Sequence, residues 1–295
     1  MFESREGRKD TKILHRFLSF LPQLAAKLPL RALHAVGTVL GWAMYGMSPT
    51  YRRHLRANLE LAGLADAAIR RASIGAAGQM IAELPALWLR PREEVVALVK
   101  EVEGMQAVFA ARAAGKALLL LTPHIGCFEI SSQYAAAHFP ITVLYRAPKM
   151  GWIEPLMRAG RERPNVRLAS ADLSGVREVL QALKRGEAVG FLPDQVPGEG
   201  EGEWAQYFGR PAYTMTLAAK LAARDNVACF LAYAKRLPRG AGYALVVRPL
   251  AEMLPAETPT RRLNRALEAL VRECPGQYLW GYNRYKTPQG VDGPA

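Results

Sequence analysis

The run Ala117-Leu-Leu-Leu-Leu-Thr-Pro123, followed by His124-Ile-Gly-Cys-Phe-Glu129, decides the fold of this chain. A short apolar run that ends at a proline is typical of a buried strand in a parallel sheet. We therefore expect a strand here, then a turn and the start of a helix. Open α/β sheets place their functional sites beyond the carboxyl ends of such strands. The polar residues after Pro123 are thus the first candidates for chemistry.

From Lys116 onward the sequence alternates between strand-like and helix-like segments. Strands are predicted at 117–122, 141–145, 166–169, 188–192, 228–232 and 243–247. One amphipathic helix is expected to begin at a Ser174 cap and to end at Gly186, and a second spans 260–272. This alternation predicts an α/β fold with a mixed, mostly parallel central sheet flanked by helices. Residues 198–203 are expected to be a flexible acidic loop that leads into an aromatic loop at 204–214.

The N-terminal part is expected to be helical and to associate with a membrane. Residues 13–62 contain three prolines and an apolar stretch, 32–47, with basic residues on both sides. As a helix this stretch is about 24 Å long, against roughly 30 Å for the hydrocarbon core of a bilayer. It predicts an interfacial or barely spanning helix, and a helix buried in the globular core is the alternative. The chain then divides into this segment (1–62), an α/β domain (63–287) and a loose tail (288–295).

Composition restricts the class of protein. Half of the 295 residues are hydrophobic and 22% are charged, so a disordered chain is excluded. The net charge of +13 indicates an anionic partner such as nucleic acid, an anionic membrane surface or an acidic carrier protein. The three cysteines show neither a disulfide framework nor zinc-ligand spacing, which favours a reducing environment.

His124 and Glu129 are the leading catalytic candidates. If His124 lies on the turn after the strand and Glu129 in the first turns of the next helix, Gly126 permits the tight turn between them. A carboxylate on one ring nitrogen would fix the imidazole tautomer and leave the other nitrogen as a base. The alternative is a histidine that caps the helix and an exposed glutamate. Cys127 between them is either an acyl-accepting nucleophile or, as we prefer, a small core residue.

Further polar residues follow the later predicted strands. Asp194 comes after a strand that ends in proline, and it either pairs with an arginine, binds a metal with His124 and Glu129, or simply occupies a turn. Arg161 is a candidate for oxyanion or phosphate stabilisation, although in so basic a chain each arginine can equally be a solvated surface charge. The candidates for substrate binding are Arg146, Lys149, Arg163 and Gln195.

The ordered set of these pieces resembles the bacterial lipid A biosynthesis acyltransferases, the lauroyl/myristoyl transferases of the His-x4-Asp/Glu glycerolipid acyltransferase superfamily. The resemblance extends from about residue 15 to 287. The matching segments are Tyr51–Leu59 after an apolar helix, His124–Glu129, Tyr145-Arg146, Gly160–Arg163, Leu192–Gln195, Glu203–Thr214 and Trp280–Lys286.

The resemblance implies a glycerolipid acyltransferase-like fold and transfer of an acyl chain from acyl carrier protein to an anionic glycolipid. The acceptor would be a hydroxyl on a 3-hydroxyacyl chain of a Kdo-bearing lipid A precursor. His124 then corresponds to the general base, Glu129 to its orienting partner, and Arg161 and Asp194 to further functional residues. No metal or cofactor is implied, and neither is nucleic acid. The site of action would be the cytoplasmic face of the bacterial inner membrane.

Two rival functions remain open from the sequence. One is an acyltransferase of the same superfamily that acts on a lysophospholipid or on a glycolipid such as a phosphatidylinositol mannoside. The other is a basic membrane- or RNA-binding protein without catalysis, in which His124 and Glu129 would be dispensable. Acyl chain length, the hydroxyl that is acylated and the oligomeric state do not follow from the sequence.

Overall fold

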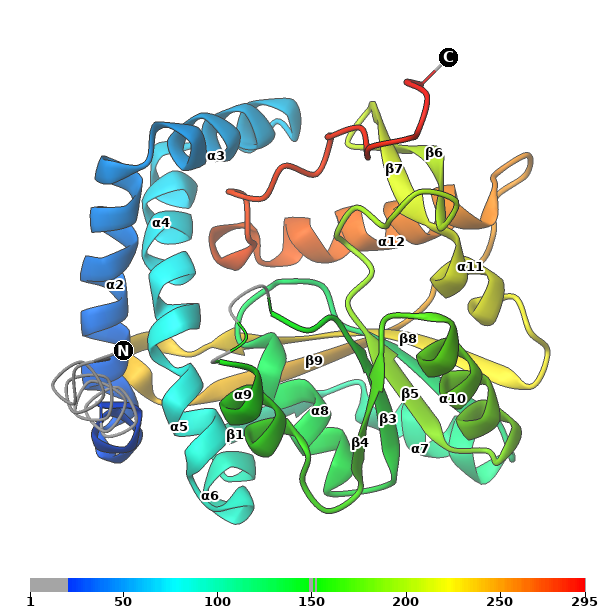
Figure 1. The fold of residues 1–295 in the computed structure, drawn as a ribbon, viewed down its shortest axis with the longest axis horizontal. Helices are drawn as coiled ribbons and strands as arrows, with labels where there is room; N and C mark the ends of the chain where they lie inside the picture. The colour runs from blue at the N-terminus through cyan, green and yellow to red at the C-terminus, as the bar shows by residue number, and fades with distance from the viewer. Residues whose placement is uncertain (1–20, 149–150, 152, 295) are drawn as a thin grey trace, which may run out of the picture.

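A seven-stranded sheet forms the centre of the protein (Figure 1). The structure is a computed structural model that describes residues 21–294 except 149, 150 and 152. The strand order is β1-β9-β8-β2-β5-β3-β4, and β6 and β7 form a separate hairpin. The strands are β1 Val99–Glu103, β2 Ala117–Leu121, β3 Ile141–Tyr145, β4 Val166–Ser170, β5 Ala188–Phe191, β6 Gly202–Tyr207, β7 Arg210–Met215, β8 Val227–Arg236 and β9 Tyr243–Pro249. Within the large sheet only β8 and β9 pair antiparallel, so the predicted mixed, mostly parallel sheet is confirmed.

Helices cover both faces of this sheet. The helices are α2 Leu30–Met47, α3 Pro49–Leu61, α4 Ala67–Ala82, α5 Leu84–Leu89, α6 Arg92–Val96, α7 Met105–Ala113, α8 Phe128–Ala136, α9 Glu154–Arg161, α10 Leu173–Lys184, α11 Thr216–Ala222 and α12 Pro259–Glu273, with 3-10 turns η1 Pro238–Gly240 and η2 Pro275–Gln277. Helices α7 and α8 pack on one face, and α10 and α11 pack on the other.

The double coverage explains the apolar run at 117–121. Every residue of β2 is buried. Leu118 and Leu120 enter the core beneath α7 and α8, whereas Leu119 and Leu121 enter the core beneath α10 and α11. A strand with helices on both faces needs apolar side chains at every position rather than at alternate ones.

Two local expectations are wrong. The aromatic segment 204–214 is not a loop, because β6 and β7 form an antiparallel hairpin whose register pairs Gly202 with Met215. Of the acidic segment, residues 198–201 lie outside the strands and 202–203 belong to β6. The hairpin packs against α12. Alternate residues of β6 are buried, but three consecutive residues of β7, Ala212 to Thr214, are buried, so the hairpin shows no clean period of two. Helix α10 is capped by Asp172 rather than Ser174, since the Asp172 carboxylate accepts hydrogen bonds from the backbone N–H groups of Ser174 and Gly175. Helix α10 ends two residues before Gly186, as predicted. Gly186 has a φ of 74°, the left-handed conformation that often ends a helix.

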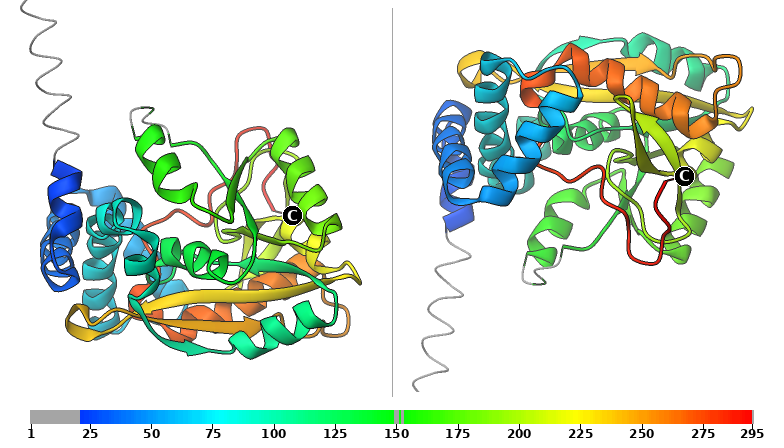
Figure 2. Two further views of the ribbon diagram at one scale, coloured as in Figure 1. Left: turned by 90° about the horizontal axis from the view of Figure 1, so that it is seen from below. Right: turned by 90° about the horizontal axis from the view of Figure 1, so that it is seen from above.

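Helices α2 and α4 pack side by side at one end of the molecule (Figure 2). They approach closely at glycines: a Cβ atom on Gly78 would lie 1.9 Å from the carbonyl oxygen of Gly37, so any side chain there would separate the helices.

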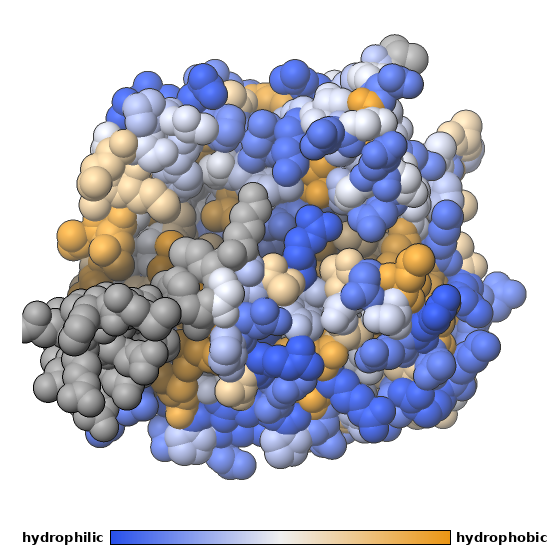
Figure 3. Space-filling model, viewed as in Figure 1, coloured by the Kyte–Doolittle hydropathy of each residue, from blue (hydrophilic) through white to orange (hydrophobic). Residues whose placement is uncertain are grey.

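The opposite face of α2 is exposed and apolar (Figure 3), and its residues include Val36, Val39, Trp42 and Met47. Among the described residues, no helix has the length and apolar character needed to cross a bilayer. The expectation of a barely spanning helix therefore does not hold for α2.

Candidate active site

His124 lies on the turn between β2 and α8, as the sequence predicts. Gly126 in this turn has a φ of 61°, and a Cβ atom there would come within 2.0 Å of the carbonyl oxygen of Ala234. The turn is also held by backbone hydrogen bonds, 2.8 Å from Cys127 N to Ala234 O and 2.9 Å from Gly126 N to Gln277 O. Only glycine fits such a position. The turn is thereby fixed against the carboxyl-terminal part of β8.

Asp194 is the side chain that orients His124. Its Oδ1 lies 2.8 Å from His124 Nδ1, and its Oδ2 accepts a hydrogen bond of 2.9 Å from the His124 backbone N–H. The two residues meet because β2 and β5 are parallel neighbours whose carboxyl ends lie at one edge of the sheet. Burial acts to raise the pKa of Asp194, but the charge and hydrogen bonds of His124 outweigh it and lower that pKa. The carboxylate is therefore ionised beside the ring.

This contact also assigns the roles of the two ring nitrogens. An ionised carboxylate at Nδ1 holds the proton on that nitrogen, which leaves Nε2 with the free lone pair. The side-chain amide of Gln195 lies 3.2 Å from Nε2, where it can donate a hydrogen bond to that lone pair. Nε2 is thus the atom of His124 that can accept a proton from a bound substrate.

The expectation that Glu129 orients His124 is wrong in this geometry. Glu129 lies in the first turn of α8 and is buried, but its carboxylate accepts two hydrogen bonds from the Arg161 guanidinium, one of them 2.9 Å from Nε. Trp88 Nε1 donates a third, at 3.3 Å. Burial acts to lower the pKa of Arg161, and the adjacent Glu129 carboxylate more than offsets this, so that pKa is raised. The Glu129 carboxylate is thus paired with Arg161 and Trp88, whereas the His124 ring is paired with Asp194.

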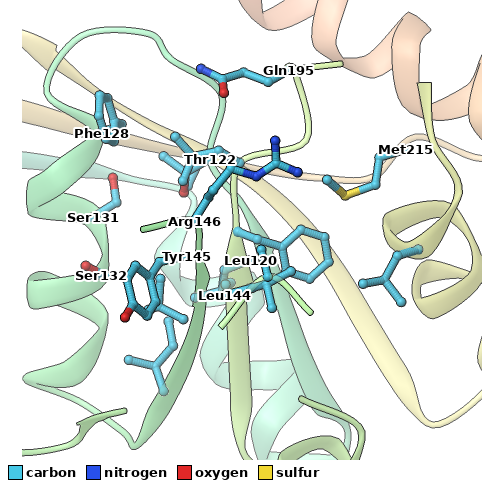
Figure 4. A pocket seen from close by; sticks show the side chains of 18 of the residues that line it. Leu120, Thr122, Phe128, Ser131, Ser132, Leu144, Tyr145, Arg146, Gln195 and Met215 are labelled. Carbon is cyan, nitrogen blue, oxygen red and sulfur yellow. The ribbon is translucent and has the colours of Figure 1, made fainter. Parts of the chain in front are cut away.

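His124, Glu129 and Arg161 all line one large cavity of about 620 Å³. Most of its walls are apolar, and Figure 4 shows Leu120, Leu144 and Met215 around it together with the hydroxyl side chains Thr122, Ser131 and Ser132. A mostly apolar cavity with a few polar groups at one place is the general form of a ligand site. Its dimensions and lining suit a long hydrocarbon ligand whose reacting atoms lie next to His124.

Three of the four predicted substrate-binding residues belong to the described part of the chain, and two of these three line the cavity. Arg146 and Gln195 line the cavity, and Arg146 is exposed. Lys149 lies outside the described residues. Arg163 does not line the cavity, because its guanidinium binds backbone carbonyls, at 3.0 Å to Gly160 and 2.8 Å to Arg90. Its contacts are those of a residue that ties α9 to the end of α5 rather than those of a substrate ligand.

The structure also decides between the roles that the sequence leaves open for Asp194 and Cys127. Asp194 does not pair with an arginine, since its contacts are to His124. Cys127 is fully buried, and burial raises the pKa of its thiol well above the ordinary value, which keeps it protonated. Within the described part of the chain, no three His, Cys, Asp or Glu side chains converge as a metal site.

Sequence reasoning missed Trp88. It lies on α5, where its Nε1 contacts Glu129 and its ring lies 6.0 Å from the Arg161 guanidinium carbon. No motif marks this tryptophan, which lies about forty residues before the carboxylate it touches. Only the packing of α5 against α8 and α9 brings it there.

The comparison with known proteins now identifies the family. The sequence pattern described as bacterial lipid A biosynthesis acyltransferase matches residues 8–287. The chain belongs to this family. It is 26% identical over 278 residues to the lipid A biosynthesis lauroyltransferase of Escherichia coli (strain K12), covering 91% of this chain and 90% of that one. It is also 26% identical over 272 residues to the lipid A biosynthesis palmitoleoyltransferase of the same organism, covering 90% and 88%.

The protein is therefore an acyltransferase of lipid A biosynthesis. A Haemophilus influenzae lipid A biosynthesis acyltransferase is a more distant relative, 22% identical over 182 residues, which cover 61% of this chain and 57% of that one. The two E. coli relatives are named for different acyl chains. Family membership thus fixes the reaction class of this acyltransferase and leaves its acyl chain open.

Proposed function

We propose that this acyltransferase moves a fatty acyl chain from acyl carrier protein to the hydroxyl of a 3-hydroxyacyl chain on a Kdo-bearing lipid A precursor. The observation that carries the proposal is the His124–Asp194 pair at the edge of an apolar cavity. A base with one free ring nitrogen suits deprotonation of a hydroxyl, and the cavity suits a hydrocarbon chain. The net charge of +13 suits an acidic carrier protein and a phosphorylated lipid.

In the proposed reaction, His124 Nε2 takes the proton of the acceptor hydroxyl while the oxygen attacks the thioester carbonyl carbon. The new C–O ester bond forms, the C–S bond breaks, and the proton passes from His124 to the departing thiolate of the carrier. Asp194 stabilises the imidazolium that exists between these steps. Base catalysis of this kind contributes about 10²–10⁴-fold to the rate.

Arg161 is proposed to face the developing oxyanion or a phosphate of the acceptor. Two of its N–H groups bind Glu129, and Nη1 has no protein acceptor among the described residues. Glu129 and Trp88 then hold this arginine at the cavity wall, so that Glu129 acts on substrate through Arg161. Donors fixed before the reaction stabilise transition-state charge without the cost of reorganisation.

The direct test uses purified protein with acyl-loaded carrier protein and a Kdo-bearing lipid A precursor. We expect mass spectrometry to show a lipid that is heavier by one acyl chain, dependent on the carrier-bound donor. In a strain that lacks the gene, lipid A should lose one acyl chain. If the enzyme acylated a lysophospholipid or a phosphatidylinositol mannoside but not the lipid A precursor, the proposed acceptor would be wrong and the rival acceptor would be supported.

We further propose that α2 attaches the enzyme to the cytoplasmic face of the inner membrane by lying in the interface. Its exposed apolar residues form one face, of which Val39 is 69% exposed and Met47 is 84% exposed. The exposed cations Lys27, Arg31, Arg53 and Arg56 flank that face. An apolar face with basic flanks binds anionic membrane surfaces by combined burial and electrostatic attraction.

Replacing Val39 with aspartate is expected to weaken binding to phosphatidylglycerol-containing vesicles about tenfold or more. Burial of one such side chain contributes roughly 1.5–3 kcal/mol, and 1.4 kcal/mol corresponds to a factor of ten. Co-sedimentation with vesicles measures the change. Gln181→Asp introduces the same charge on the exposed surface of α10 and should leave binding unchanged. Equal effects of the two substitutions would argue against α2 as the membrane-contacting element.

A further inference from the structure

The cavity beside His124 extends along both faces of the sheet. One arm lies under the face covered by α7 and α8. Its apolar walls include Val108, Leu120, Ala135, Ile141, Leu168 and Val247. The other arm lies on the opposite face, between α10 and α11. Its walls include Leu173, Val176, Phe191, Met215, Leu217 and Lys220.

His124 lies where the two arms meet. It follows β2, the strand whose Leu120 lines the first arm, and its neighbour Gln195 follows β5, whose Phe191 lines the second. Figure 4 shows this division: Phe128, Ser131 and Ser132 of α8 are on one side of the strands and Met215 is on the other. Any group held at His124 therefore has two apolar routes leading away from it.

The first arm has the walls of an enclosed channel. All six of its named wall residues are buried. On α8 three of the lining residues, Ser131, Ser132 and Ala135, are small, and Phe128, Glu129 and Tyr134 also line the cavity. Gly190 on β5 likewise lines it without a side chain. Small residues on facing elements leave space for a hydrocarbon chain that is removed from water.

The second arm is open to the surface, and its rim carries charges of both signs: Lys220, Asp172 and Glu201. Leu173 at the start of α10 is 79% exposed, and Lys220 near the end of α11 is exposed. Val176, Met215 and Leu217 are half-buried, so that a ligand could cover them further. Because it is open to the surface, this arm suits a chain that remains attached to a large lipid.

The proposed reaction brings two hydrocarbon chains to one point. The donor acyl chain ends at the thioester carbonyl, and the acceptor hydroxyl is on the third carbon of another fatty chain. Beyond that carbon, the acceptor chain must leave the site through an apolar region that the donor chain does not occupy. A single arm could not accommodate both.

We propose that the arm between α10 and α11 is a second acyl-binding site, which holds the distal hydrocarbon of the acceptor's hydroxylated chain. The enclosed arm is then left for the donor chain. This assignment rests on the proposed function, because it takes a 3-hydroxyacyl lipid as the acceptor. It makes Val176 of α10 and Leu217 of α11, which both line the cavity, specificity-determining residues for the length of the acceptor chain.

The test compares two Kdo-bearing lipid A precursors that differ only in the chain with the acceptor hydroxyl, which is 3-hydroxytetradecanoyl in one and 3-hydroxybutanoyl in the other. For the wild-type enzyme we expect a lower KM with the long chain. Val176→Trp fills the open arm and should raise the KM for the long acceptor about tenfold, the loss expected when roughly two methylene groups leave the groove. The KM for the short acceptor and the KM for the acyl-carrier donor should not change.

Two further variants keep the result interpretable. Leu217→Trp fills the same arm from α11 and should reproduce the effect, so the proposal does not depend on the folding of one variant. Gln181→Trp places the same ring on the exposed surface of α10 and should change no KM.

If both groove variants changed the donor KM, or neither changed the preference for the long acceptor, the assignment of this arm would be wrong. A wild-type enzyme that acylated neither of the two lipid A precursors would instead overturn the proposed function. The two failures are therefore distinguishable.

Discussion

Replacing His124 with alanine is expected to lower acyl transfer by about 10²–10⁴-fold at saturating substrates, the contribution typical of a positioned general base. His124 Nε2 is the free ring nitrogen at the cavity, since Nδ1 lies 2.8 Å from Asp194. The remaining rate should come from binding of the two substrates and from oxyanion stabilisation. Quantitative mass spectrometry of the lipid product measures the loss. Near-normal turnover of the variant would exclude His124 as the base.

Asp194→Asn extends this prediction to the pair. An asparagine cannot stabilise the imidazolium, so turnover should fall within the same range of about 10²–10⁴-fold. Because the two side chains act as a unit, His124→Ala combined with Asp194→Asn should be little worse than His124→Ala alone. Glu129→Gln combined with His124→Ala should cause a further loss, since Glu129 contacts Arg161 instead. If Asp194→Asn lowered the turnover of the His124→Ala variant further and Glu129→Gln did not, Glu129 rather than Asp194 would be the partner of His124.

Asp225→Asn provides the matched control for a lost carboxylate. Asp225 is exposed and does not line the cavity. Its replacement should leave turnover unchanged.

Local signals in the sequence account for the part of the fold that could be predicted. This part includes the β2 run, the His124 turn and the positions of the later strands along the chain. Each depends on periodicity or on a nearby proline or glycine, which are local signals. The partner of His124 could not be predicted from such local signals. Glu129 was the expected partner because it is near in sequence, whereas Asp194 is seventy residues away and reaches His124 only because β2 and β5 pair in parallel.

The contacts among Glu129, Arg161 and Trp88 could not be predicted from the sequence for the same reason. Its three members come from α8, α9 and α5, and the packing of these helices determines that they meet. From the residues alone Arg161 was one of several candidate arginines, and the family resemblance added support for its functional role. The β6–β7 hairpin and β1 were missed because short strands rich in glycine, proline or charge show little of the period-two pattern.

Replacing Glu83 with alanine is expected to lower the free energy of unfolding by about 3–5 kcal/mol, because it leaves a buried arginine unpaired. Glu83 is 1% exposed and accepts hydrogen bonds from Arg236 at 2.9 Å, from Tyr243 at 3.0 Å and from His34 at 3.1 Å. Arg236 Nη2 also donates to the carbonyl of Gly126, at 3.0 Å. The group thus joins α2, α4 and β8 to the turn that carries His124. Urea denaturation at pH 7 measures the change.

The stabilisation by Glu83 should depend on pH in a defined direction. Burial acts to raise its pKa, but the charge of Arg236 and the hydrogen bonds from Arg236 and His34 lower it from 4.5 to about 2. A carboxylate with a lowered folded-state pKa stabilises the protein above its unfolded pKa. Its contribution is therefore complete above about pH 5 and is lost as the pH falls toward 2. Glu83→Gln should remove this part of the pH dependence, whereas Glu187→Gln, at a surface pair with Arg185, should change it far less.

A paired substitution decides whether the unpaired charge causes the loss. Removing one partner of a buried ion pair strands the other, while replacing both with apolar residues of similar size is often close to neutral. Glu83→Leu with Arg236→Met should therefore unfold at a higher urea concentration than Glu83→Ala alone. If the double variant were less stable than the single one, Arg236 would contribute mainly through Gly126 rather than through Glu83. In that case its contact with the catalytic turn, and not the ion pair, would be the larger part of its role.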